Sequence, residues 1–474
     1  MGQNPFKKLE RINVKIEKLA FGGAGIGYIK SEADTAKPED AAKPMVVFVE
    51  DTVPGDEITA EIRKIKPNYL EAKLTEIVKP SAFRIEPRCK HFNICGGCSL
   101  QNLNYDEQLK IKENQVREAL SHIGGIKDPP VLKIIGYTGG ENGPWFYRNK
   151  MEFSFGTGGD GNATAGGNVT LGLHPKHYRY DVFQLEECFL ENSDIGEMVR
   201  AIAEFMNEKD SGLLKTFTVR EGKRTGERMV NLTVSDAPFL RQKEFVEMLT
   251  RSKKFKAPNS VYLTNQIIKK GHRTELIENL LFGEAFLKEK MMLQNGSTLE
   301  FEIFPQSFFQ PNTLQAEILY QKVIDMGEIE NGSVVYDLFC GTGTIGLFAA
   351  HRAGEVLGVD INESAIKNAR ANAEKNGIKN VKYYIGDVFK VITGRTDKPD
   401  VVIVDPPRAG LGDKLCGHLL EVRAPKIVYV SCNPGTLARD LKILCAGKYN
   451  LAGIQPVDMF PQTYHIETVC ELKL

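Results

Sequence analysis

The chain has no apolar stretch near the roughly 18 residues that a membrane span requires, so we expect no membrane-spanning segment. Residues 1–8 are polar and basic with no apolar run behind them, and we expect no secretory signal there. A surplus of charge is also lacking, because 61 Lys and Arg balance 61 Asp and Glu. Nucleic-acid binders often carry a basic surplus, so the total weighs mildly against such a partner without excluding a local basic face.

Cysteine is too sparse for a disulfide scaffold, with nine in 474 residues and an odd count. We therefore expect reduced thiols, a cytoplasmic location and, as the default, a monomer. The segments richest in Lys and Arg, 220–228 and 253–256, are candidates for contact with nucleic acid.

The length exceeds that of one ordinary core, and we expect about two to four domains. Short alternating runs broken by Gly and Pro predict a small β-barrel, with a flexible polar insertion at 32–43. The next part mixes strands with helices, such as one over 106–121, and has a glycine-rich loop at 156–168. Strands then alternate with helices, which predicts a parallel sheet and an α/β fold class. The predicted domains are a barrel at 1–80, an α+β central domain at 81–300 and an α/β domain at 301–474.

Residues 334–346 read as a strand, a glycine-rich loop and the start of a helix. Gly341 and Gly343 let the backbone pass close to a ligand. The next strand ends in Asp360, whose carboxylate can accept hydrogen bonds from ribose hydroxyls. Asp337 precedes the glycines, where it would repel a pyrophosphate but suits a cationic methionine moiety.

Two later strands also end in side chains that carry chemistry. Asp405 follows the apolar run 401–404 and precedes Pro-Pro, and Cys432 follows the run 426–430. Ligands of open α/β sheets bind at the carboxyl edge of the strands, so Cys432 is a candidate nucleophile. The glycine loop and the later Asp-Pro-Pro together resemble the class I (Rossmann-like) S-adenosylmethionine-dependent methyltransferases.

A second group of cysteines lies near the N-terminus. Cys89, Cys95 and Cys98 fall within ten residues, with two glycines between the last two. Cys188 is the only other cysteine before residue 340. Four thiolates suit zinc or an iron–sulfur cluster, although the spacing is not the repeated Cys-x2-Cys of a zinc ribbon.

Together the parts resemble the RNA 5-methyluridine methyltransferases over nearly the whole chain. The barrel is similar to the TRAM domain, an RNA-binding module of the oligonucleotide-binding-fold (OB) type, and the cysteine spacing matches the iron–sulfur branch of that family. The small departures are Thr344, where some relatives carry Asn, and the Pro-Pro after Asp405, where others have Pro-Ala. Five further segments follow the order of the family: 308–312, 337–346, 405–410, 431–434 and 465–469.

The resemblance implies methylation of C5 of a uridine in RNA, with 23S ribosomal RNA favoured over transfer RNA because the cluster-bearing branch mostly acts there. It implies Cys432 as the nucleophile and Glu467 as the base. The implied contacts of S-adenosylmethionine are Gln310, Phe339, Asp360, Asp387 and Asp405. The implied ligands of a 4Fe–4S cluster are Cys89, Cys95, Cys98 and Cys188.

This reaction requires these residue types. C5 of uracil is a poor nucleophile until a thiolate adds at C6, and a base must later remove the C5 proton so that the thiol can leave. No electron is transferred, so the cluster is expected to be structural or to help dock RNA. Two alternatives stay open: a methyltransferase that modifies a base amino group through Asp405-Pro-Pro and needs no thiol, and a non-catalytic iron–sulfur protein that binds RNA.

Overall fold

The computed structural model describes residues 6–30, 44–140, 143–156, 169–178, 180–206, 210, 212–393, 395 and 397–474. The predicted flexible insertion at 32–43 lies outside these residues, as does the predicted glycine-rich loop from 157 onward. The described helices include none that is long and apolar enough to cross a membrane.

The N-terminal strands form a closed barrel in the order β1-β2-β3-β5-β4. Alternate side chains of β1 point inward, among them Val14 and Ile16, and pack with Val47 and Leu70 from other strands. The prediction of a small β-barrel is therefore confirmed. The strands are β1 (Arg11–Leu19), β2 (Gly25–Ile29), β3 (Met45–Val49), β4 (Glu57–Ile65) and β5 (Tyr69–Lys79).

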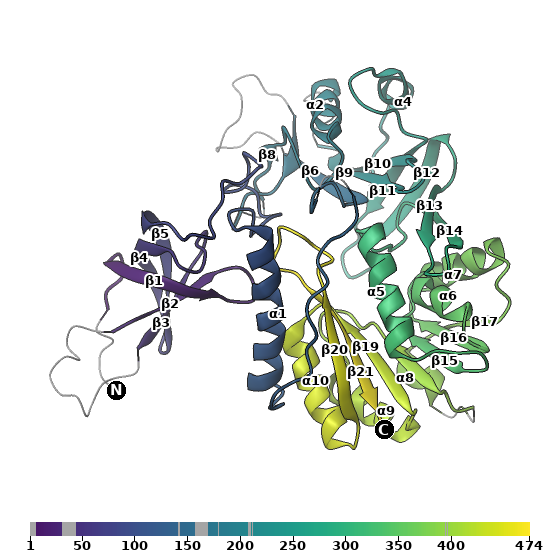
Figure 1. Cartoon of the computed structure of the whole chain (residues 1–474). Helices are drawn as coiled ribbons and strands as arrows, with labels where there is room; N and C mark the ends of the chain where they lie inside the picture. The colour runs from purple at the N-terminus through teal and green to yellow at the C-terminus, as the bar shows by residue number, and fades with distance from the viewer. Residues whose placement is uncertain are drawn as a thin grey trace.

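Helix α1 (Tyr105–His122) stands between the barrel and the C-terminal sheet (Figure 1). Val116 and Leu120 of α1 belong to the hydrophobic core of the C-terminal domain. The segment that follows forms isolated bridges from Val131 and Ile135 to the C-terminal strand β20 (Asn450–Val457). Part of the predicted central domain therefore packs against the C-terminal domain, and the predicted boundaries stay a prediction.

The central domain is built on a seven-stranded sheet in the order β12-β11-β10-β9-β6-β7-β8. Helices α2 (Ile195–Phe205) and α4 (Gln242–Arg251) supply Val199 and Leu249 to the core on one face of this sheet. The strands are β6 (Lys150–Gly156), β7 (Thr170–Leu173), β8 (Phe183–Gln184), β9 (Leu214–Glu221), β10 (Arg228–Ser235), β11 (Ser260–Ile267) and β12 (Glu275–Gly283).

The basic segment 220–228 does not present all its arginines to solvent. Arg228 is buried and forms ion pairs with Asp194 and Glu221. Arg220 is buried and donates to the carbonyl oxygens of Pro305 and Ser307. These two arginines are therefore used inside the protein, and contact of the rest of the segment with nucleic acid stays a prediction.

The C-terminal domain is an open α/β sheet in the order β17-β16-β15-β18-β19-β21-β20. The first five are parallel, and β21 runs antiparallel to both β19 and β20. A hairpin, β13 (Leu287–Met292) and β14 (Thr298–Ile303), precedes this sheet. The remaining strands are β15 (Val334–Leu338), β16 (Glu355–Asp360), β17 (Val381–Ile385), β18 (Val401–Val404), β19 (Lys426–Ser431) and β21 (Glu467–Lys473).

Helices connect these strands and complete the predicted α/β domain. They are α5 (Thr313–Met326), α6 (Thr344–Ala350), α7 (Glu363–Lys375), α8 (Val388–Ile392), α9 (Gly412–Val422) and α10 (Pro434–Ala446). The strand order reverses at β15, which has β16 on one side and β18 on the other. A crevice at such a reversal, outside the carboxyl ends of the strands, is the usual ligand site of open α/β sheets.

Candidate active site

The loop after β15 has the backbone that a close ligand contact requires. Phe339, Gly341 and Gly343 all have positive φ, at 64°, 53° and 78°. A non-glycine residue in this region is strained, so Phe339 is held there by its surroundings. Its neighbour Cys340 donates its N–H to the carbonyl of Val359 (3.0 Å), which fixes the loop against β16.

Asp360 closes on this loop from the end of β16. Its Oδ2 accepts the N–H of Gly341 (3.0 Å), and its Oδ1 accepts the N–H of Asn362 (2.8 Å). Asp387 lies on the neighbouring strand's loop, since Gly386 donates its N–H to the carbonyl of Asp360 (2.9 Å). Asp387 is exposed and caps α8 by accepting the N–H of Lys390 (3.1 Å). The structure thus places the carboxylate of Asp360 against the loop after β15, whereas the carboxylate of Asp387 caps α8 on the neighbouring loop.

Gln310 reaches the same edge from the segment before α5. Gln310 is only 8% exposed, and its backbone carbonyl accepts a hydrogen bond from Asn149 Nδ2 (2.8 Å). Thr342 of the glycine loop donates its hydroxyl to the carbonyl of Phe308 (3.2 Å). Phe308 itself is 64% exposed. Residues 308–310 therefore lie directly against the loop after β15.

Asp337 is a buried carboxylate that lacks a partner. Neither of its oxygens has a hydrogen-bond partner among the residues that the structure describes. Gly346 lets it lie against α6, because a Cβ there would be 2.8 Å from Asp337 Oδ2. Burial, and then the negative charge of Asp405, raises the pKa of Asp337 to about 8. A buried, unpaired carboxylate is costly, so a ligand that brings a cation or a donor would fit this place.

Cys432 and Glu467 face each other across two strands. Ser431 pairs with Thr468 in the antiparallel β19–β21 ladder, so the next residue, Cys432, stands opposite Glu467. Glu467 is 5% exposed, and Cys432 is half-buried. The predicted nucleophile and a buried carboxylate, which are 35 residues apart in the sequence, thus meet at the carboxyl edge of β19.

The electrostatics at this pair favour the protonated forms. Burial, and then the charges of Glu467 and Asp405, raises the pKa of Cys432 to about 11, while Arg408 opposes the rise. Burial, and then Asp405, raises the pKa of Glu467 well above its ordinary value, and Arg408 again opposes it. Burial raises the pKa of Asp405 to about 7. The site therefore gathers acidic groups that a bound cation would stabilise in their charged forms.

The loops after β18 and β19 are tied together. Asn433 caps α10, since its Oδ1 accepts the N–H of Gly435 (3.0 Å). Asn433 Nδ2 and the hydroxyl of Thr436 both donate to the carbonyl of Arg408 (3.4 and 3.2 Å). The Asn-Pro sequence after Cys432 thus begins a helix and holds the thiol beside the Asp405 loop.

Tyr320 was not among the residues that the motifs singled out. It lies on α5 and is buried, and burial followed by the charges of Asp405, Asp337 and Glu467 raises its pKa well above the ordinary value. Its hydroxyl therefore lies among the acidic groups. No local pattern in α5 reveals this, because the neighbours come from three different strand ends.

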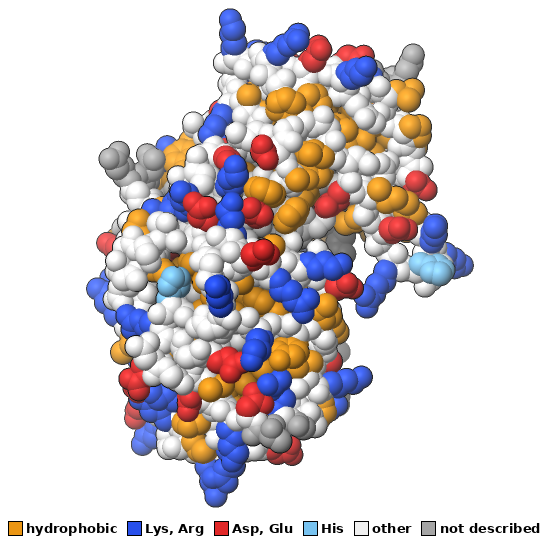
Figure 2. All heavy atoms as spheres, turned by 90° about the vertical axis from the view of Figure 1, so that its right-hand side faces the viewer, with side chains coloured by type: hydrophobic (Ala, Val, Ile, Leu, Met, Phe, Trp, Pro, Cys, Tyr) orange, Lys and Arg blue, Asp and Glu red, His pale blue; other side chains and the backbone are white. Residues whose placement is uncertain are grey.

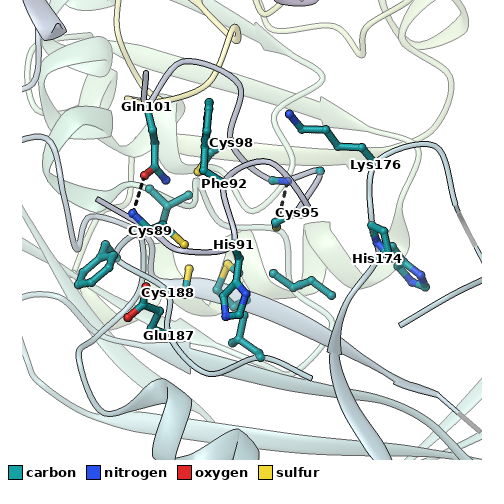
Figure 3. A pocket seen from close by; sticks show the side chains of 18 of the residues that line it. Cys89, His91, Phe92, Cys95, Cys98, Gln101, His174, Lys176, Glu187 and Cys188 are labelled. Carbon is teal, nitrogen blue, oxygen red and sulfur yellow. Dashed lines mark hydrogen bonds between the residues drawn. The ribbon is translucent and has the colours of Figure 1, made fainter. Parts of the chain in front are cut away.

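The four N-terminal cysteines line one pocket of about 660 Å³ (Figure 3). Burial raises the pKa of Cys98 to about 12 and of Cys188 to about 11, and in both cases other cysteines add to the rise. The amide of Gly97 donates to Cys95 Sγ (3.3 Å), and Cys89 donates its N–H to Gln101 Oε1 (3.1 Å). The pocket thus holds thiols whose ionised forms repel one another.

The described ranges contain no group of three or more His, Cys, Asp or Glu side chains close enough to hold a single metal ion. An iron–sulfur cluster binds one thiolate at each iron, so its cysteines stand further apart than the ligands of one ion. Four cysteines around one pocket fit that donor set, because positively charged irons would stabilise their thiolates.

Comparison with known proteins identifies the class of enzyme. Three family descriptions match: "TRAM domain" at residues 5–75, "tRNA (Uracil-5-)-methyltransferase" at 241–385 and "Methyltransferase domain" at 329–465. An uncharacterized RNA methyltransferase of Protochlamydia amoebophila is 39% identical over 451 residues, which cover 89% of this chain and 99% of that protein. The chain belongs to the RNA 5-methyluridine methyltransferase family. It is an RNA (uracil-5-)-methyltransferase, and the non-catalytic alternative is excluded.

Further relatives agree with this assignment. An uncharacterized RNA methyltransferase of Halalkalibacterium halodurans is 33% identical, over 100% of this methyltransferase and 99% of that protein. The crystal structure of the Pyrococcus abyssi tRNA (uracil-54, C5)-methyltransferase in complex with S-adenosyl-L-homocysteine superposes with a TM-score of 0.71. It is 28% identical and covers 97% of this chain and 100% of the other. The sequence resemblance to this family is therefore confirmed.

The neutral total charge proved a poor guide to the RNA substrate. On the face seen in Figure 2, Lys and Arg side chains are interspersed with Asp and Glu and form no single basic patch. Part of the positive charge is internal, as in the ion pairs of Arg228. The net charge of the sequence therefore counts internal ion pairs together with the charges on the surface that meets RNA.

Proposed function

We propose that this methyltransferase transfers a methyl group from S-adenosylmethionine to C5 of a uridine through a covalent bond between Cys432 and C6. The observation that carries the proposal is the register of β19 and β21, in which Cys432 is opposite Glu467 beside Asp405. A thiol and a buried carboxylate at one strand end are the two groups that this reaction needs.

Cys432 and Glu467 act at successive steps of the reaction. The Cys432 thiolate adds to C6 of uracil, which places electron density at C5, and C5 then takes the methyl group. S-adenosylmethionine would supply that methyl from its positively charged sulfur, which would keep the electrons of the broken S–C bond and leave as the neutral thioether. Glu467, as a carboxylate, removes the C5 proton, and the electrons of that bond restore the ring as the thiolate leaves C6. Because the base must leave its stack to reach Cys432, the target is a flipped or single-stranded uridine.

The proposed cofactor contacts are Gln310, Phe339, Asp360, Asp387 and Asp405. Asp337 supports this placement, since its buried carboxylate has no partner in the described part of the chain. A cationic methionine moiety would favour the ionised form of Asp337, and Asp360, which already accepts the N–H of Gly341, would meet the ribose. The same cation would lower the pKa values of Cys432 and Glu467, which burial and the neighbouring acidic groups raise.

The proposed target is 23S ribosomal RNA, and this part rests on the four-cysteine motif. The test uses protein purified without oxygen, mixed with S-adenosylmethionine and ribosomal or transfer RNA fragments that carry 5-fluorouridine. Fluorine at C5 blocks proton removal, so the enzyme stays attached to its RNA. We expect an adduct with a ribosomal fragment that is lost in Cys432→Ala. The matched control is Cys445→Ala, which removes a half-buried thiol of α10 outside the site.

Other results would change the proposal in defined ways. An adduct with transfer RNA alone would move the target to that RNA and leave the mechanism intact. Full methylation by Cys432→Ala, with no adduct on any RNA, would favour the amino-group methyltransferase that uses Asp405-Pro-Pro.

We further propose that Cys89, Cys95, Cys98 and Cys188 hold a 4Fe–4S cluster with a structural role. The support is the single pocket that all four line and the spacing of the first three. The test is the iron and sulfide content of anaerobically purified protein. Cys98→Ser should lower both, whereas Cys416→Ser, another buried cysteine, should not. Stoichiometric zinc in place of iron would refute the cluster.

A further inference from the structure

Helix α1 carries a stripe of polar side chains that point into the protein. Tyr105, Gln108 and Lys112 are spaced by three and four residues, which places them on one face of the helix. Gln108 and Lys112 are fully buried. All three contact residues 458–466, which connect β20 to β21 and end immediately before Glu467; we call this segment the base loop.

One anchor holds the start of the base loop. Lys112 Nζ pairs with Asp458 Oδ1 (2.6 Å) and donates to the carbonyl of Phe460 (3.1 Å). The hydroxyl of Tyr105 donates to Asp458 Oδ2 (2.8 Å). Asp458 directly follows Val457, which is the strand partner of Glu467. This anchor therefore fixes the residue next to the partner of the base.

The second anchor holds Gln462. The side chains of Gln108 and Gln462 are joined by a hydrogen bond from Gln108 Nε2 to Gln462 Oε1 (3.0 Å). Gln108 Oε1 also accepts the N–H of Gln462 (3.1 Å). The carbonyl of Gln462 accepts the N–H groups of Ser99 and Leu100, both at 3.0 Å. Gln462 has φ of 68°, a conformation that is strained for this residue and that these four bonds maintain.

The anchored turn leads directly to the base. Thr463 donates its hydroxyl to the carbonyl of Phe460 (2.8 Å), and His465 donates its N–H to the Thr463 hydroxyl oxygen (3.2 Å). Ile466 is fully buried, and Glu467 begins β21. A displacement of Gln462 would therefore also displace the carboxylate of Glu467, because a short, hydrogen-bonded turn connects the two residues.

We propose that the Gln108–Gln462 pair is a positioning device for Glu467, so that α1 sets the rate of proton removal from C5. The inference rests on the proposed function, in which Glu467 is the base. The hydrogen bonds at the loop of Cys432 do not involve this pair, since they come from the cap of α10 and the loop after β18. Weakening the pair therefore slows the last step and spares the addition of the thiolate and the transfer of the methyl group.

The variants are Gln462→Met and Gln108→Met, which keep the length of the side chain and remove the amide. Gln462→Met is the milder change, because Gln108 still donates to the carbonyls of Leu100 and Leu103 (2.9 and 2.8 Å). The matched control is Gln115→Met on the same helix, since Gln115 donates to Leu19 of the barrel (3.2 Å) and does not reach the base loop.

The measurement is the fraction of enzyme bound covalently to RNA with ordinary uridine, on a denaturing gel, beside the turnover rate and the melting temperature. Misplacing a catalytic group by about 1 Å can cost 10²-fold, so we expect turnover to fall about 10- to 100-fold in both variants. The methylated adduct should accumulate in them, as in Glu467→Gln, whereas Gln115→Met should turn over normally without an adduct. The double variant should turn over no more slowly than Gln108→Met alone, because that change already removes the bond that Gln462→Met removes.

Three results separate the possible failures. Slower turnover without an adduct, or loss of melting temperature alone, would overturn the positioning role and leave a structural one. Unchanged turnover in Gln462→Met would also overturn it. If even the unmodified protein formed no adduct with 5-fluorouridine RNA, the covalent mechanism itself would fail, and the positioning role with it.

Discussion

The acidic groups around Cys432 predict that the charge of the cofactor controls the reactivity of the thiol. Burial and the neighbouring acidic charges raise the pKa of Asp337 to about 8 and of Cys432 to about 11, and burial raises the pKa of Asp405 to about 7. S-adenosylmethionine carries a positive sulfur, whereas S-adenosylhomocysteine lacks only the methyl group and that charge. Exchanging one for the other changes the charge at the site with little change in shape.

The magnitude follows from the fraction of thiolate. With a pKa of about 11, Cys432 is ionised to roughly one part in 10³ at pH 8. If the cation returns the pKa to its ordinary value of 9.0, the ionised fraction becomes about one part in ten. The rate of alkylation of Cys432 should then rise by up to about 100-fold, because the thiolate is the reactive form.

The assay is alkylation by iodoacetamide from pH 6 to 9, followed by mass spectrometry of the peptide that contains Cys432. S-adenosylhomocysteine shields the thiol to the same extent and serves as the matched ligand. Cys445 supplies an internal control, because its pKa is raised by burial alone. Equal rates with the two ligands, both at saturating concentration, would refute the electrostatic account of the site.

Three other perturbations test the same structure. Asp337 has a pKa raised to about 8 in the folded protein, so between about pH 4 and 8 only the unfolded chain loses this proton and the folded state loses stability. The gain in melting temperature from Asp337→Asn should therefore grow over that range, and a constant gain would contradict this. Lys112→Met alone should cost about 3–5 kcal/mol in urea unfolding, because it leaves Asp458 charged and buried; Lys112→Met with Asp458→Leu should recover most of it, and equal losses would argue against the charge. Arg408→Met should raise the pKa of Cys432 and slow its alkylation several-fold at pH 8; an unchanged rate would remove Arg408 from the account.

The edge of the methyltransferase sheet could be predicted because its strands are parallel. Asp360 is the last residue of β16, Asp405 directly follows β18, and Cys432 directly follows β19. Parallel strands end at one edge, so a residue's place at a strand end is enough to bring it to the site. The barrel could be predicted as well, because the alternation of polar and apolar residues along most of β1 indicates which side chains point inward.

The features of the site that could not be predicted depend on contacts between segments that are distant in the sequence. Glu467 reaches Cys432 through an antiparallel strand, and the register that places them opposite is a property of the folded sheet. Tyr320 joins the acidic groups from a helix whose sequence shows no sign of it. The reading of α1 followed its apolar periodicity and passed over Gln108 and Lys112, since polar residues ordinarily mark the solvated face of a helix.

The proposed nucleophile and the proposed base differ in what supports them, and this limits what the C-terminal domain can do alone. The hydrogen bonds that hold the loop of Cys432 come from its own domain, through the cap at Asn433 and the carbonyl of Arg408, and α1 only packs against the helix that follows. The base loop is held by α1 and by Ser99, which directly follows Cys98. The thiol therefore depends on the cofactor-binding sheet, while the placement of Glu467 depends on segments that precede it by more than 300 residues. Removal of the C5 proton, which frees the product, is thus the proposed step most sensitive to changes in the N-terminal half of the chain.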